Sequence, residues 1–144
     1  MATRGSIGFL VQEVPDAFRG RTSLRNWLSQ VAQDHGTRID SMSFVLMSDK
    51  ALLYYNKTFL DHDDHTDVIT FPVESNNGVA GDVLISYDRI RENASSFGVS
   101  AQDELHRVMV HGLLHLLGHK DKTKAQREAM RGLEEKYLAR YPKA

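Results

Sequence analysis

The chain has 144 residues, of which 41% are hydrophobic and 26% are charged, a composition typical of one globular domain that can bury a full core. The formal net charge of -1 does not indicate the strongly basic surface of a general nucleic-acid-binding protein, so any such surface must be local. The absence of cysteine excludes disulfide-linked partners and thiolate metal sites.

The first half of the chain alternates short apolar runs with amphipathic segments. Residues 7–11 predict a strand, and Ser23 is a suitable N-cap for the helix that follows. That helix is expected to bury the apolar residues that recur at helical spacing, Leu24, Trp27, Leu28, Val31 and Ala32. Residues 43–47 predict a second, buried strand, after which Ser48 and Asp49 can cap a second helix.

A polar loop rich in aspartate and histidine precedes two β-rich runs, VITFPV and VAGDVLIS. The segment ESNNG between them contains asparagine and glycine, which tolerate positive φ, so the two runs are expected to pair as an antiparallel hairpin. A third helix is predicted over residues 87–97, closed by Gly98.

Ser100 is a plausible cap for a fourth helix that is apolar on nearly every face up to Leu117. A helix with this pattern is expected at the centre of a domain. An amphipathic helix over residues 123–141 follows, with an inner side that covers either the sheet or the central helix.

Nothing in the chain indicates a second domain or a membrane segment. No repeat or linker-like tract interrupts it, and no run approaches the roughly 18 apolar residues that a membrane span needs. The apolar stretch near the start is too short for a signal peptide. We therefore expect residues 1–144 to form one domain, with a cytoplasmic location and no membrane partner.

The central helix carries the candidate metal site. His111 and His115 are four residues apart, so both imidazoles project from one face of the helix, about one turn apart. Two histidines in so apolar a helix must stay neutral and find partners, and a divalent cation satisfies two lone pairs at once. The alternative is a pair of core histidines bonded to backbone or side-chain groups.

Gly118 favours the metal site because it can end the helix in a left-handed conformation and turn the chain back. In the zincin-type pattern the third ligand lies six residues beyond the second histidine, which here is Asp121. His119 is the rival, and it would face the site if the helix continued. Because Gly118 argues against continuation, we prefer Asp121.

Gly112 bears on the class of reaction. A metallopeptidase of the HExxH kind carries its general base, a glutamate, directly after the first histidine, where this chain has Gly112. Peptide hydrolysis in that form is therefore disfavoured. Three protein ligands and an open coordination position fit phosphodiester hydrolysis, in which the ion polarises a phosphoryl oxygen or activates a water.

Three motifs then resemble one family. HGLLHLLGHKD, TDVITFP at residues 66–72 and GDVLIS at residues 81–86 are similar, in order and spacing, to signatures of the YbeY family of bacterial rRNA maturation factors. The resemblance implies a compact α/β (α+β) domain with a small mixed sheet, a hairpin, four to five helices and a zincin-like central helix. It also implies one bound Zn²⁺ or similar divalent ion.

The function that the resemblance implies is a metal-dependent, single-strand-specific endoribonuclease acting on rRNA of the small ribosomal subunit, in its maturation and in ribosome quality control. His111 and His115 are then the catalytic residues, and with Asp121 they hold the ion that activates water. One alternative is a non-catalytic ribosome assembly factor with a structural metal. A divergent zincin-type metallopeptidase is the other.

Two positions depart from the family pattern. Asp121 stands where the familiar motif has a third histidine, which adds negative charge and could admit harder ions such as Mn²⁺. Leu60 stands where many members have an arginine thought to assist catalysis, so that role cannot be carried over. His62 or His65 could replace it, although solvated histidines without a role are the simpler interpretation.

The remaining polar features have weaker interpretations. Asp67 and Asp82 are expected to support the site indirectly or to bond turn amides rather than to take part in catalysis. The C-terminal segment has more cations than anions: Lys122, Lys124, Arg127, Arg131, Lys136, Arg140 and Lys143 against Glu128, Glu134 and Glu135. This excess could contact a phosphate backbone, but a solvated helix face has the same composition.

Overall fold

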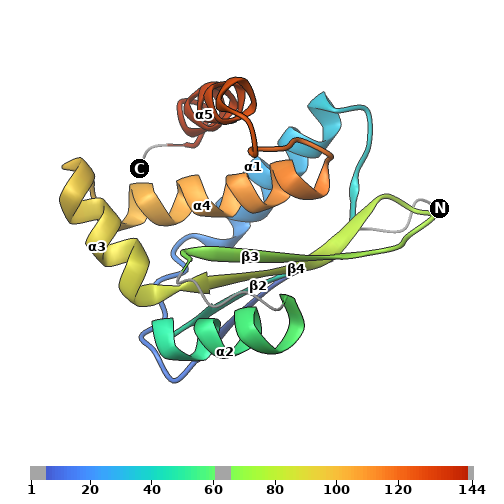
Figure 1. The fold of residues 1–144 in the computed structure, drawn as a ribbon. Helices are drawn as coiled ribbons and strands as arrows, with labels where there is room; N and C mark the ends of the chain where they lie inside the picture. The colour runs from blue at the N-terminus through green and yellow to red at the C-terminus, as the bar shows by residue number, and fades with distance from the viewer. Residues whose placement is uncertain (1–5, 61–65, 143–144) are drawn as a thin grey trace.

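A computed structural model of the protein describes residues 6–60 and 66–142. In these ranges the chain forms four strands and five helices around one mixed sheet (Figure 1). The elements follow in the order β1 (Ser6–Gln12), α1 (Arg21–Asp34), β2 (Ile39–Met47), α2 (Asp49–Leu60), β3 (Val68–Val73), β4 (Val79–Ser86), α3 (Tyr87–Phe97), α4 (Ala101–Leu116) and α5 (Lys124–Leu138). The predicted α+β fold is confirmed.

The strands lie in the order β1-β2-β4-β3. β1 and β4 both run parallel to β2, whereas β3 pairs antiparallel with β4. The predicted hairpin is therefore confirmed. Gly78 is needed in it, because its φ is 141° and a Cβ there would lie 2.3 Å from the carbonyl oxygen of Arg38.

The sheet separates a large core from a small one. α2 covers one face, and α1, α4 and α5 lie on the other (Figure 1). The alternation of side chains along β2 and β4 sends Phe44, Leu46, Val83 and Ile85 into the large core, and Met47 and Leu84 into the small core under α2. α4 is buried at the centre of the large core, as its apolar pattern predicts.

Two glycines allow α4 to lie close against β4. A Cβ on Gly112 would lie 2.7 Å from Cγ1 of Val83, and one on Gly81 would lie 2.9 Å from Cδ2 of Leu116. Real side chains do not approach so closely, so a side chain at either position would displace its neighbour on the facing element. Gly112 therefore has a packing role in addition to breaking the HExxH pattern.

Three predicted boundaries were wrong. α1 begins at Arg21 with Gly20 as its left-handed N-cap, not at Ser23, because apolar spacing locates the buried face of a helix and not its exposed first turn. β2 begins at Ile39, four residues before the predicted strand, because polar Asp40 and Ser41 obscured its first part. α5 begins as expected, with a capping box from Thr123, but ends at Leu138.

One buried histidine lies outside the candidate site. His106 of α4 is 7% exposed, its Nε2 has no hydrogen-bond partner among the described residues, and its ring centroid lies 4.3 Å from that of Tyr141. Burial lowers the pKa of His106, partly opposed by the charge of Asp103. The histidine is therefore neutral in the folded protein at neutral pH.

The lowered pKa of His106 predicts an acid-sensitive core. The folded state binds a proton on His106 less readily than the unfolded state does. The contribution of His106 to the free energy of unfolding is therefore constant above the unfolded pKa of about 6.5. Below that pH the free energy of unfolding falls, by at most about 1.4 kcal/mol per pH unit. Urea unfolding at neutral and mildly acidic pH should show a smaller acid loss for His106→Phe than for the natural protein. Equal losses would contradict this assignment.

Candidate metal centre

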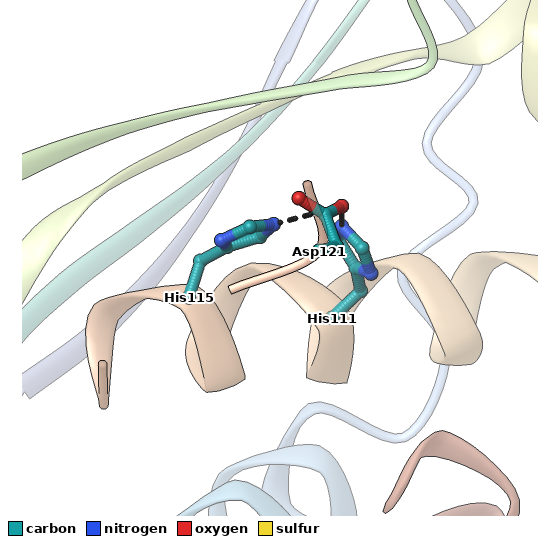
Figure 2. A group of neighbouring side chains, drawn as sticks. All are labelled: His111, His115 and Asp121. Atoms are coloured by element: carbon teal, nitrogen blue, oxygen red, sulfur yellow. Dashed lines mark ion pairs between the residues drawn. The ribbon is translucent and has the colours of Figure 1, made fainter. Parts of the chain in front are cut away.

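α4 presents His111 and His115 on one face, as the spacing predicts. Their ring centroids lie 4.6 Å apart with the planes at 73°, and both side chains are half-buried. Figure 2 shows the two rings rising from successive turns of the helix toward a common point. The Nε2 atoms are the ones that face this point, since both are within 3.5 Å of the same carboxylate oxygen.

Gly118 brings that carboxylate to the histidines. It adopts a φ of 104°, its amide bonds the carbonyl of His115 at 3.0 Å, and the amide of His119 bonds the carbonyl of Leu114 at 3.0 Å. The chain then turns back, and Oδ2 of Asp121 lies 3.3 Å from Nε2 of His115 and 3.5 Å from Nε2 of His111 (Figure 2).

The donor set of this triad fits a divalent ion. The three ligand atoms lie within 4.8 Å of one another. Two ligands bound tetrahedrally at zinc-like bond lengths of about 2.0–2.1 Å are about 3.3 Å apart, and the two histidine-to-Asp121 distances of 3.3 and 3.5 Å are close to this value. Both also exceed the usual length of a direct N–H···O hydrogen bond.

His119 makes a different contact. Its Nε2 lies 2.8 Å from Nε2 of His35, whose Nδ1 lies 2.7 Å from the carbonyl oxygen of Val31. Since a carbonyl only accepts, His35 donates from Nδ1, so in its neutral form its Nε2 accepts from His119. Burial and the nearby His35 and His115 lower the pKa of His119. The structure thus places Asp121, and not His119, beside the paired histidines.

A buried glutamate that the sequence analysis did not single out orients His111. Oε2 of Glu134 on α5 lies 2.6 Å from Nδ1 of His111, and the side chain of Glu134 is 6% exposed. Burial alone would raise the pKa of Glu134, but the hydrogen bonds from His111 and Arg107 lower this pKa below its ordinary value. The ionised carboxylate can only accept, so Nδ1 of His111 carries the proton and Nε2 keeps the lone pair that a metal needs.

Arg107 holds Glu134 in turn. Its Nη1 donates to Oε1 of Glu134 at 3.0 Å, and its Nε donates to Glu104 at 2.9 Å. Burial alone would lower the pKa of Arg107, but Glu104 and Glu134 raise this pKa, so Arg107 stays charged. Nη2 also lies 3.5 Å from Oδ2 of Asp67, so Arg107 and Glu134 link Asp67 to the triad. This agrees with the indirect role expected of Asp67.

The other residues singled out in the sequence lie away from the triad or outside the described residues. Asp82 lines a hollow on the α2 face of the sheet together with Phe71 and Leu84. Leu60, at the position of the family arginine, ends α2 and is 39% exposed. His62 and His65 lie outside the described residues. Gly112 faces Val83, so a longer side chain at that position would meet the sheet.

The fold and the triad define a mixed α+β protein with a candidate metal centre on a zincin-like central helix. None of the helices in the part of the chain that the structure describes is both long and apolar enough to cross a membrane. Comparison with known proteins then identifies the family. The family described as Endoribonuclease YbeY matches residues 12–142, and the chain belongs to it.

Relatives agree with this assignment, and a solved structure shares the fold. A protein of Cytophaga hutchinsonii named endoribonuclease YbeY is 41% identical over 135 residues, which cover 93% of this chain and 94% of the relative. One of the same name from Bacteroides thetaiotaomicron is 41% identical over 127 residues, covering 88% of this chain and 91% of the relative. A solution structure of a Thermotoga maritima protein superposes with a TM-score of 0.61 at 25% identity, covering 94% of this chain and 91% of the other.

Proposed function

We propose that this protein is a metal-dependent endoribonuclease that cleaves single-stranded RNA. The convergence of two imidazole Nε2 atoms and one carboxylate oxygen on α4 carries the proposal, in a chain whose relatives are named endoribonucleases. His111, His115 and Asp121 are the proposed ligands. An ion in this site supplies a Lewis acid that polarises a phosphoryl oxygen and lowers the pKa of a water molecule.

The protein's own residues prepare the site. Glu134 fixes the tautomer and the ring orientation of His111, and Arg107 keeps Glu134 ionised and in place. The side chain of Asp121 is 36% exposed, so the triad is open to an incoming RNA strand on that side. A closed structural site would be shielded from solvent by its fourth protein ligand.

Zinc is the proposed ion, and the ligand types explain why manganese remains an alternative. Two imidazoles and one carboxylate suit Zn²⁺, while the carboxylate of Asp121 also favours harder ions such as Mn²⁺. The proposed substrate is rRNA of the small ribosomal subunit, in the cytoplasm, and the proposed role is rRNA maturation and ribosome quality control. A single domain over residues 1–144 is supported by a core cluster that runs from Ile7 in β1 to Tyr137 in α5.

Leu60 favours the alternative of a non-catalytic ribosome assembly factor, because it supplies no cation where many members of the family have an arginine. The peptidase alternative is disfavoured by the packing of Gly112 on Val83, which leaves no room for the base of an HExxH site.

A cleavage assay tests the nuclease proposal. Purified protein with added Zn²⁺ or Mn²⁺ should cut a short unstructured RNA, and His115→Ala, prepared in parallel, should reduce cutting to background. The variant also reports contaminating nuclease. If both preparations cut equally, the activity does not belong to this site, and a non-catalytic assembly factor becomes the better description. A denatured protein substrate should remain intact in the same assay.

A further inference from the structure

A pocket of about 310 Å³ opens between α4 and α5 directly beside the triad. It shares His111 and Asp121 with the candidate metal centre, so one ligand can occupy the pocket and the metal centre at the same time. The walls that belong to α5 are rich in cations: Lys124, Arg127 and Arg131. The pocket is therefore more basic than the chain as a whole, whose net charge is -1.

The three cations form one stripe along α5. They are separated by three and four residues, so their side chains lie on one face of the helix. All three residues are exposed. Their spacing covers about 10 Å of the helix axis, over which a stacked nucleic-acid strand carries about three phosphates.

The charges of this stripe are available to a ligand. Neither Lys124 nor Arg131 forms an ion pair with another residue that the structure describes. Arg127 donates from Nη1 to the carbonyl oxygen of Lys122 at 2.7 Å, and within residues 6–60 and 66–142 it forms no ion pair with a carboxylate. Three carboxylates line the pocket: Asp121 belongs to the triad, Glu134 is paired with Arg107 and His111, and Glu128 is exposed on α5.

We propose that this pocket binds the phosphate backbone of the single-stranded RNA on one side of the scissile bond. This inference rests on the proposed nuclease function. A polyanion matches the three cations that line one wall of the pocket. His111 and Asp121 line the same pocket, so this wall lies next to the phosphate that would react at the metal centre. The pocket positions RNA and does not read its sequence, because contacts to phosphate carry no base information.

Direct binding tests the subsite without relying on cleavage. The affinity of a labelled, unstructured RNA is measured by fluorescence anisotropy in a His115→Ala background, which cannot cut. Into it are introduced either Lys124→Ala with Arg131→Ala, or a matched control, Lys50→Ala with Lys136→Ala. Each pair removes two positive charges, but Lys50 lies on α2 and Lys136 on a different face of α5.

The pocket pair should weaken binding roughly tenfold at about 0.1 M salt and reduce the slope of log affinity against log salt by about 1.4, since each phosphate contact on a single strand contributes about 0.7. The control pair should change neither value appreciably. In enzyme with His115 intact, the pocket pair should raise KM, leave kcat nearly unchanged and leave the metal content unchanged.

RNA binding by the pocket pair that is as tight as by the control would overturn the subsite. Failure of the nuclease proposal looks different: wild type and His115→Ala would then cut RNA equally, whatever the binding data show. Unchanged circular dichroism and melting temperature of both double variants would exclude misfolding as the cause of a binding loss.

Discussion

His115→Ala and Asp121→Ala are each expected to yield a purified protein without its stoichiometric metal ion, whereas His119→Ala should keep it. The side chains of His115 and Asp121 meet at 3.3 Å, and removal of either leaves two donors on a half-exposed surface. His119 instead bonds His35 at 2.8 Å, so its loss costs a hydrogen bond away from the triad. Elemental analysis of the purified variants measures the ion directly.

Anomalous scattering from crystals of the loaded protein provides the second measurement, because it places the ion relative to Asp121 and His119. RNA cleavage should follow metal content: near background for His115→Ala and Asp121→Ala, and close to wild type for His119→Ala. An empty site in His119→Ala together with a full one in Asp121→Ala would reverse the ligand assignment.

The parts of the site that sequence analysis predicted are those set by local geometry. The spacing of four residues brings His111 and His115 onto one face of any helix, and a glycine after the helix is the usual place for a left-handed turn. Together these features bring Asp121 back to the two rings. Nothing beyond the segment from His111 to Asp121 was needed for that prediction.

The supporting residues depend on how distant segments pack. Glu134 is 23 residues from His111, and their contact exists only because α5 packs on α4. A signal was present, since Glu134 lies between Met130 and Tyr137 on the buried face of α5, where an unpaired carboxylate would be costly. Its partner could not be identified without the position of α5. The pocket beside it has the same origin, since its lining combines residues of α4, of α5 and of the turn between them.

The clearest test of this support is Glu134→Ala, which should weaken zinc binding by about 10- to 100-fold, the usual effect of losing the partner of a metal-bound histidine. Without the carboxylate, Nδ1 of His111 loses its acceptor, and the ring is free to rotate and to change tautomer. The zinc affinity of Glu134→Gln should lie between those of the natural protein and Glu134→Ala, because an amide oxygen can still accept from Nδ1 but carries no charge. Competition with a chromogenic chelator measures the affinity.

Glu135→Ala is the matched control, because Glu135 is an exposed carboxylate on the next position of α5 and should leave zinc affinity unchanged. Glu134→Ala also leaves Arg107 with fewer partners in a half-buried position, so the metal-free protein should unfold at lower temperature, by the equivalent of about 1–3 kcal/mol. A loss of stability alone would indicate a structural role for Glu134. A partial recovery of zinc affinity in Glu134→Gln would show that Glu134 also positions His111. If folded Glu134→Ala bound zinc as tightly as Glu135→Ala, the contact would have no part in holding the ion, and the orientation of His111 would have to come from α4 alone.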